Sequence, residues 1–442
     1  MKSSVLPEDE FLGTTRSFAY GLQHVLTMYG GIVAPPLIVG AAIHLSTPQI
    51  GLLITASLFV GGLATLLQTL GIRFFGAKLP LVQGVSFAGV SSMIAIGTGV
   101  GGGTVGFQTI LGAVIGSAVI GLLIAPLFSK ILRFFPPVVT GCIITIIGVS
   151  LLPVALHWII GGQTGAPSQH NLILASFTLV VLLFLSKLKV ESCKRLAVLM
   201  SIIVGTLLAY FLGWCDFSKV AQGDILALPS ILAFGAPIFS LPAIVVMLVV
   251  TIVTLTETTA DILAVGEIVG TEITPQRIAN GLRADMLSST VAPFFGTFMQ
   301  SAFAQNVGLV AITGIKSRYV VAAGGIILVI LGMFPIMGRF VAAIPSAVLG
   351  GAGLILFGSV AASGIRTLSQ VDYQNQNNLI IIALSLTAGI IPMVSPEFFT
   401  EFPKWVQILC HSGISTTCIT ALVLNIFFNH IGKSQAVSKG VA

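Results

Sequence analysis

The stretch PPVVTGCIITI at residues 136–146 returns 209 residues later as PSAVLGGAGLI at residues 345–355. Without a gap, two prolines, two valines, two glycines and two isoleucines align: Pro136 with Pro345, Val139 with Val348, Gly141 with Gly350, and Ile146 with Ile355. Upstream at the same offset, Gly116, Leu122 and Pro126 align with Gly325, Leu331 and Pro335, and Lys130 aligns with Arg339. The chain therefore contains an internal repeat.

Composition places this repeat in a membrane. Of the 442 residues, 55% are hydrophobic and only 8% are charged, whereas a soluble protein carries about 25% charged residues. Such a chain cannot cover a water-facing surface, so the lipid bilayer must surround it. The five cysteines form no CxxC pair, which argues against a disulfide framework or a zinc site. We expect no metal and no cofactor.

Apolar segments long enough to cross about 30 Å of hydrocarbon number about 14. We predict them at residues 17–39, 49–71, 80–97, 106–128, 137–156, 170–186, 196–213, 240–265, 278–297, 302–315, 320–337, 343–363, 377–393 and 411–429. The repeated segments are seven spans apart. An odd offset reverses orientation, so the two halves form an inverted repeat, as in many secondary transporters. The predicted fold is an all-α polytopic membrane protein.

The basic residues test this topology, because Lys and Arg gather on the cytoplasmic side of membrane proteins. With both termini in the cytoplasm, 17 of the 20 basic residues fall on or near the inner side. Lys219, Arg339 and Lys404 fall outside. The net charge of +6 is therefore a topology signal, and we expect no nucleic-acid partner. A membrane enzyme is also disfavoured, since no nucleophile–base pair, HExxH or phosphate loop is present.

Two predicted spans are short and interrupted by glycine and polar residues. One contains Gln83-Gly84-Val85-Ser86-Phe87, and the other contains Ala304-Gln305-Asn306-Val307-Gly308. Interrupted helices at corresponding places in two repeats indicate a binding site near the membrane midplane, and half-helix N-termini expose free N–H groups. Ionisable groups in apolar spans are costly, and a carrier retains them at a water-accessible site. Four such residues are candidates: His24, Glu257, Asp261 and Asp285.

Each candidate has a plainer interpretation. Glu257 and Asp261, four residues apart on one helical face, could be hydrogen-bonded packing residues, and Asp285 could lie near the interface beside Arg277 and Arg283. His24 could be a packed histidine. Gln305 and Asn306 could cap the broken helix, and Phe87 is a stacking face only if its span is broken.

The segment Gln305-Asn306-x-Gly308-x-x-x-x-Thr313-Gly314 resembles the signature of the nucleobase/ascorbate transporter family. Gln23-His24, the Gln-Gly-x-Ser-Phe segment at 83–87, Thr256-Glu257-Thr258 and Asp285 are similar to that family at the expected spacing. The resemblance covers nearly the whole chain. It is strongest to the bacterial xanthine and uric acid permeases, through GEIVG at 266–270 and QNVGLVAITG at 305–314.

The resemblance implies 14 spans in two inverted seven-span repeats, with short strands and half-helices in spans 3 and 10. A core domain would comprise residues 1–128 and 240–340, and a gate domain residues 129–239 and 341–442. Glu257 and Gln305 would bind a base, and a signature that begins with Gln accompanies purines. We expect Asn306, Val307, Gly308, Ser86 and Phe87 to line the same site. The resemblance also implies a homodimer.

We therefore predict a symporter in the inner cell membrane that imports xanthine and/or uric acid with protons. His24, Glu257, Asp261 and Asp285 are the candidates for carrying the proton. Some uracil carriers have a histidine where this chain has Asp261, so the proton pathway stays open. The alternatives are a uracil or general nucleobase carrier, an anion carrier of the same general fold, and sodium rather than proton coupling.

Overall fold

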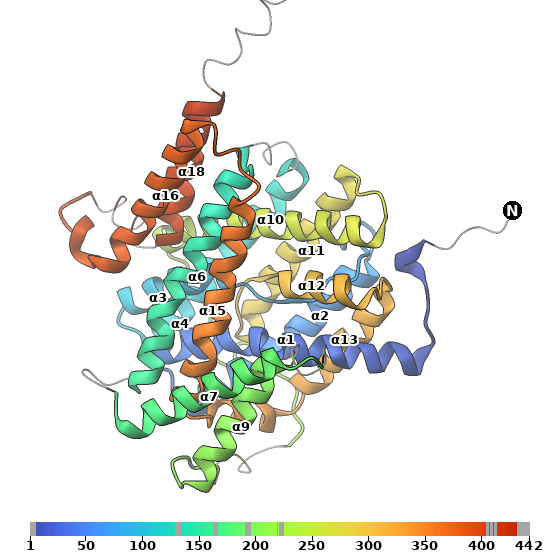
Figure 1. Ribbon diagram of the computed structural model, residues 1–442, viewed down its shortest axis with the longest axis vertical. Helices are drawn as coiled ribbons and strands as arrows, with labels where there is room; N and C mark the ends of the chain where they lie inside the picture. Colours follow the sequence, from blue (N-terminus) through green and yellow to red (C-terminus); the bar gives the residue numbers. More distant parts are fainter. Residues whose placement is uncertain are drawn as a thin grey trace, which may run out of the picture.

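The computed structural model describes residues 6–128, 134–161, 167–190, 196–218, 220, 225–403, 406, 410 and 413–430 (Figure 1). Lys130, Lys219 and Lys404 therefore lie outside the described residues, as does part of the predicted span 411–429. The described chain is mostly helical.

Its elements follow the chain in this order. The first half contains α1 (Thr14–Ala42), α2 (Thr47–Leu70), β1 (Gln83–Val85), α3 (Val90–Gly99), α4 (Gly103–Ile124), α6 (Pro137–Ile160), α7 (Gln169–Lys187) and α9 (Ala197–Phe211). The second half contains α10 (Leu241–Val269), α11 (Pro275–Val291), β2 (Gln300–Ala302), α12 (Ala304–Thr313), α13 (Arg318–Gly332), α14 (Pro335–Ala342), α15 (Ser346–Leu368), α16 (Gln376–Val394) and α18 (Gly413–Asn425).

Many of these helices can cross a bilayer. Within the described residues, nine are long and apolar enough to do so, and ten if the bent pair α13–α14 counts as one span. The helix at Phe87–Gly99 and α9 are apolar but shorter. The chain is therefore a multi-pass membrane protein.

Two predicted spans differ from the structure: for 278–297, α11 ends at Val291 and a 3-10 turn follows at Ala292–Phe295, and the span at 320–337 is broken. Residues 320–337 were expected to form one helix, but α13 ends at Gly332 and α14 begins at Pro335 after a bend of 79°. Phe334 is extended, with φ −108° and ψ 90°, because the residue before a proline avoids the helical region. Pro335 then starts α14, where its missing N–H costs nothing.

Helices of the two halves pack across each other. In Figure 1, α6 and α15 run side by side, and α10 to α13 lie in a separate group. A Cβ added at Gly141 of α6 would lie 2.7 Å from the Leu368 side chain, and one at Gly350 of α15 would lie 2.7 Å from Ile159. The two contacts are equivalent in the repeat, because Gly141 aligns with Gly350 and Ile159 aligns with Leu368 at the offset of 209 residues. Glycine allows this close approach, as at other membrane helix crossings.

Other helices also pack against helices from the opposite half of the sequence. Helix α13 packs against α1 and α2, whereas α4 packs against α10 and α11. Each of these bundles therefore combines helices from both halves of the sequence. Buried aliphatic and aromatic side chains of α1, α2, α4, α6 and α10 form the largest hydrophobic cluster.

Two short strands cross inside the bundle. Strands β1 and β2 are antiparallel, and Gly84 lies opposite Ser301 at the centre of the pair. The backbone bonds are matched on the two sides: the Ser86 N–H donates to the Met299 carbonyl (2.9 Å), and the Phe303 N–H donates to the Val82 carbonyl (3.1 Å).

A hydroxyl also holds the first residue of each strand. The Gln83 N–H donates to Thr65 Oγ1 of α2 at 2.9 Å, and the Gln300 N–H donates to Ser289 Oγ of α11 at 2.9 Å. Each hydroxyl also lies within reach of the carbonyl of the same glutamine. The hydroxyls satisfy backbone groups that a two-stranded sheet leaves unpaired within the membrane interior.

Candidate functional site

The strand crossing places two helix starts deep in the molecule. Strand β1 leads into a short 3-10 turn (Phe87–Gly89) and α3, and β2 leads into α12. Neither Gly89 nor Phe303, the residues that precede α3 and α12, caps its helix with a side chain. At the start of α12 the Asn306 N–H donates to the Phe303 carbonyl at 2.9 Å, and the Ala304 and Gln305 N–H groups have no partner among the described residues, so they stay available to a ligand.

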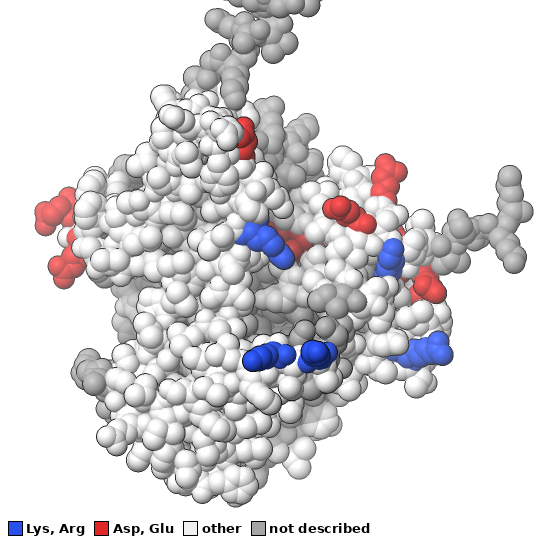
Figure 2. All heavy atoms as spheres, viewed as in Figure 1, with Lys and Arg blue, Asp and Glu red and all other residues white. Residues whose placement is uncertain are grey.

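One face of α12 is open. Ala304, Gln305, Gly308 and Ala311 are exposed and share a face at helical spacing. A Cβ added at Gly308 would meet no atom within 4 Å. In the part of the chain that the structure describes, the Gln305 amide has no hydrogen-bond partner. Figure 2 shows the molecular surface hollowed between the group containing α6 and α15 and the group containing α10 to α13.

The neighbouring Asn306 points the other way and is fully buried, with 0% exposure. Its Oδ1 lies 2.7 Å from His24 Nδ1, and its Nδ2 donates to the Pro80 carbonyl at 2.7 Å. The Asn306 amide thus ties α12 to α1 and to the segment before β1. It does not cap α12, and His24 is a packed, hydrogen-bonded histidine.

Two acids lie one turn apart on α10, which packs against α12. Glu257 is half-buried, and Asp261 is 9% exposed. Neither carboxylate has a hydrogen bond or ion pair to any residue whose placement is described. They are therefore not the hydrogen-bonded packing residues of the plainer interpretation, and they keep their acceptor capacity for a ligand or a proton.

The third acid, Asp285, lies on α11 and is 1% exposed. It accepts hydrogen bonds from Thr258 Oγ1 (2.5 Å) and from Gln68 Nε2 (3.3 Å). Thr258 in turn accepts from the Ala302 N–H of β2 at 3.3 Å. Asp285 therefore joins α2, α10 and the strand pair. Among the described residues Asp285 forms no ion pair with its neighbouring arginines: Arg283 donates to Asn280, and Arg277 pairs with Glu8.

Ser86 and Phe87 lie where the chain leaves β1. Ser86 is buried, and its hydroxyl accepts from the Ala88 N–H at 3.3 Å, so it starts the 3-10 turn. Phe87 is half-buried, and its ring meets Phe357 of α15 edge to face, with centroids 6.3 Å apart. On α12, Val307 is half-buried. Of these predicted residues, Gly308 is exposed, Phe87 and Val307 are half-buried, and Ser86 is buried.

Four polar residues that organise the site were given no role in the sequence-based prediction: Thr65, Gln68, Thr258, which was quoted only as part of the family motif, and Ser289. Gln68 lies within a predicted apolar span, and that isolated amide was an available signal. The hydroxyls of Thr65, Thr258 and Ser289 carried no comparable signal, because Thr and Ser commonly bond to their own helix.

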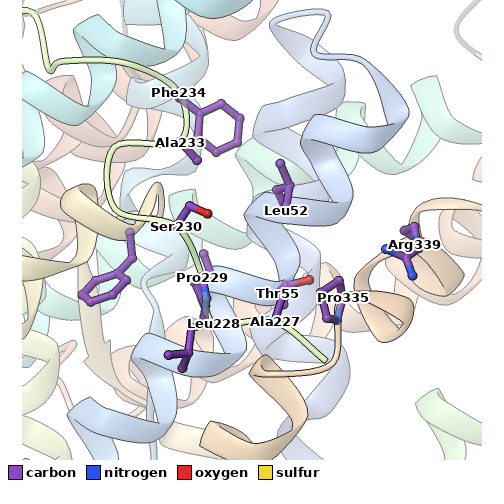
Figure 3. Close-up of a pocket in the computed structure, with 12 residues that line it drawn as sticks. Leu52, Thr55, Ala227, Leu228, Pro229, Ser230, Ala233, Phe234, Pro335 and Arg339 are labelled. Carbon is purple, nitrogen blue, oxygen red and sulfur yellow. The ribbon is translucent and has the colours of Figure 1, made fainter. Parts of the chain in front are cut away.

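Two smaller cavities lie away from these residues. One of about 200 Å³ is lined by α2, residues 227–234 and α14, and Figure 3 shows Leu52 and Thr55 facing that segment with Arg339 at one end. The Arg339 side chain donates to the Val220 carbonyl at 2.9 Å. The second cavity, of about 290 Å³, lies between the residue 6–9 turn and the start of α11. Neither contains a predicted site residue.

The open face offers a defined chemistry. The Gln305 amide both donates and accepts, and the Glu257 carboxylate accepts from N–H groups. The start of α12 adds backbone donors and a partial positive charge. A flat heterocycle with neighbouring N–H and C=O groups on one edge matches this set of partners.

Broken helices that cross at mid-depth in a multi-pass bundle, beside unpaired acids, are typical of secondary transporters. The chain matches the sequence model of a permease family, Xan_ur_permease, over residues 15–398. It belongs to this family, the nucleobase/ascorbate transporters identified from the signature at residues 305–314. The family consists of permeases and not of enzymes.

Relatives match over nearly the full length. The chain is 39% identical to the xanthine permease of Bacillus subtilis over 97% of both sequences. It is 41% identical to the uric acid transporter UacT of Escherichia coli, over 95% of this chain and 88% of that one. It is also 41% identical to the uric acid permease PucK of B. subtilis, over 92% and 94%.

Solved structures share the fold at low identity. The transmembrane domain of the cyanobacterial bicarbonate transporter BicA superimposes with a TM-score of 0.63 at 13% identity, over 94% of this chain and 98% of that one. The inward-facing murine anion transporter Slc26a9 gives 0.64 at 15% identity, over 96% and 70%.

Proposed function

We propose that this permease imports xanthine, uric acid or both across the inner cell membrane, coupled to protons. The open Gln305 amide at the start of α12 and the unpaired Glu257 carboxylate of α10, a helix that packs against α12, carry the proposal. A purine dione presents lactam N–H and C=O groups on one edge, which an amide and a carboxylate pair fully. The relatives from B. subtilis and E. coli are a xanthine permease and a uric acid transporter, which supports the same substrate class.

Each residue has a proposed role. Gln305 and Glu257 bind the base, and Phe87 and Gly308 bound its ring. Asn306, held by His24 and the Pro80 carbonyl, fixes the start of α12, and Val307 and Ser86 support the same corner. Hydrogen bonds that involve a charged partner contribute about 1.5–3 kcal/mol each. Analogues that lack a lactam group would leave these polar groups unpaired.

We assign proton coupling to Asp285 or Asp261, with Glu257 reserved for binding. Asp285 bonds to Thr258 on the helix of Glu257 and Asp261, and Thr258 bonds to β2. Protonation of Asp285 would therefore change contacts of the strand pair from which α12 begins. His24 is a weaker candidate, because its ring is engaged with Asn306.

The proposed architecture is 14 spans in two inverted repeats, with residues 1–128 and 240–340 as core and 129–239 and 341–442 as gate. Three matched features support it: the glycine contacts of α6 and α15, the exchange of helices between halves, and the equivalent backbone bonds of β1 and β2. Both termini are placed in the cytoplasm. A homodimer remains part of the proposal, supported by the family resemblance.

The test is uptake of radiolabelled xanthine in cells that lack purine permeases. Unlabelled urate, guanine, hypoxanthine and uracil serve as competitors. We expect xanthine or urate to compete most strongly. Competition by uracil alone, or uptake of none of these bases, would contradict the proposal.

A further inference from the structure

An acidic turn ahead of α1 is locked into the protein. Residues Pro7–Asp9 form a 3-10 turn, and Glu8 is 1% exposed. Glu8 Oε1 accepts a hydrogen bond from Arg277 Nη2 at 2.8 Å and another from Thr271 Oγ1 at 2.8 Å. A carboxylate this deeply buried is stabilised chiefly by its charged partner, so the position of Glu8 and that of Arg277 depend on each other.

Arg277 uses its remaining donors on a different part of the chain. Its Nε donates to the Ala77 carbonyl at 2.7 Å, and Nη2 also donates to the Lys78 carbonyl at 2.9 Å. Nη1 donates to Thr271 Oγ1 at 3.1 Å. The rigid guanidinium fork can hold these partners only in one orientation. Glu8 therefore fixes the orientation in which Arg277 donates hydrogen bonds to the carbonyls of residues 77 and 78.

The segment at residues 77–82, which Arg277 binds at its start, leads directly to the candidate site. Two residues after Lys78, the Pro80 carbonyl accepts from Asn306 Nδ2 at 2.7 Å. Two residues further, the Val82 carbonyl accepts from the Phe303 N–H at 3.1 Å. Both bonds reach the start of α12, where Gln305 is exposed. Hydrogen bonds and the backbone of residues 78–82 between them thus join Glu8 to Phe303 and Asn306, which flank Gln305.

We propose that Glu8 and Arg277 are positioning residues for the substrate site, acting through residues 77–82 on the start of α12. The inference rests on the proposed function, because the site at Gln305 is itself proposed. It assigns a role in binding to a segment ahead of the first span.

The adjacent Asp9 provides a matched control. Asp9 Oδ1 accepts from Arg318 Nε at 2.6 Å, and Arg318 also donates to the Thr69 and Leu70 carbonyls at the end of α2. This second ion pair has the same chemistry and lies on the same turn. Among the described residues, none of its hydrogen bonds reaches residues 77–82 or α12 directly. Its nearest link is Gln68, next to Thr69: the carbonyl and side-chain oxygen of Gln68 accept from the Lys78 and Ala77 N–H groups. The two pairs therefore compare a direct hold on residues 77 and 78 with an indirect one.

The experiment compares Glu8→Gln, Arg277→Lys and the double variant with Asp9→Asn, measuring KM and Vmax per transporter in the membrane. We expect Glu8→Gln and Arg277→Lys each to raise KM about tenfold, with Vmax changed by less than about twofold. The double variant should raise KM no more than the larger of the two single changes does, because both substitutions break the same connection between Glu8 and α12. Asp9→Asn should leave KM unchanged.

Unchanged KM in Glu8→Gln, or equal KM changes in Glu8→Gln and Asp9→Asn, would overturn the proposal. So would a loss of membrane abundance with normal KM in the remaining protein, which marks a purely structural role. A second readout needs no purine: the rate at which a thiol reagent modifies Ala304→Cys in a background without native cysteines.

A change of about threefold or more in that rate with Glu8→Gln, but not with Asp9→Asn, would support positioning of α12. Equal rates would overturn it. If the unaltered protein takes up no purine, the proposed function fails, and the labelling rates still decide the role of Glu8.

Discussion

At the residue scale, Gln305 and Asn306 show how adjacent amides take different tasks. The Asn306 amide is hydrogen-bonded to His24 and to the Pro80 carbonyl, whereas the Gln305 amide lies on the exposed face of α12. The difference arises from helical geometry, since neighbours along a helix point about 100° apart. Binding chemistry should therefore be sensitive to Gln305 and folding to Asn306.

Replacing Gln305 tests this division. Gln305→Ala should weaken purine affinity by about ten- to a hundredfold, because two hydrogen bonds to the ring are lost, with membrane abundance near normal. Gln305→Glu should alter selectivity, since a carboxylate cannot donate. Competition binding to purified protein measures both, and Gln370→Ala, an exposed glutamine elsewhere, is the control. Normal affinity in Gln305→Ala would remove Gln305 from the site.

Asp285 is the residue on which coupling can be separated from binding. Asp285→Asn keeps the size of the side chain and removes its capacity to take up a proton. We expect uphill accumulation of xanthine to be lost while calorimetry still detects binding. Accumulation in sodium-free buffer should also collapse with a protonophore in the unaltered protein. Uptake that survives the protonophore but needs sodium would refute proton coupling.

At the element scale, the crossing of α6 and α15 depends on glycine. A Cβ at Gly148 would lie 2.2 Å from the Ala361 backbone nitrogen, whereas Gly358 of α15 has nothing within 4 Å of that position. Gly148→Ala should destabilise the protein by about 1–3 kcal/mol through overpacking. Gly358→Ala should be neutral or stabilising, because alanine favours helix.

Thermal unfolding in detergent, followed by intrinsic fluorescence, compares these two matched substitutions. A lower midpoint for Gly148→Ala alone is the expected result. Equal midpoints would mean that the crossing relaxes at no cost.

The elements also show what sequence can and cannot predict. Glycine and polar residues marked the interruptions at 83–87 and 304–308. Strand β1 lies in the first, and β2 ends just before the second, which is the start of α12. The bend before Pro335 was missed, although that proline was visible, because the apolar run continues through it. The partners of Asn306 could not be predicted: His24 is 282 residues away, and such contacts leave no local pattern.

At the scale of the whole molecule, the distribution of basic residues predicts the orientation. Ser395, at the end of α16, should lie outside the cell, and Gln374, before α16, should lie inside. In a background without native cysteines, an impermeant thiol reagent should label Ser395→Cys in intact cells and Gln374→Cys only after permeabilisation. The reverse pattern would invert the proposed topology.

Several features of the molecule were predicted: the multi-pass helical bundle from composition, the place of the broken helices from their glycine and polar residues, and the permease family from the signature at residues 305–314. The number of spans and the partition into core and gate stay predictions. The role of the acidic turn at Pro7–Asp9 could not be foreseen, because Glu8 and Asp9 look like ordinary solvated charges until Arg277 and Arg318 are placed beside them.

The edge-to-face contact between Phe87 and Phe357 has a kinetic consequence. It joins the turn that precedes α3 to α15, so any sliding of one group of helices past the other must separate these rings. An aromatic pair of this kind contributes only about 0.5–1.5 kcal/mol, not far above thermal energy. Thermal motion therefore breaks and re-forms the contact between the rings readily. This contact alone would not limit the rate of a transport cycle.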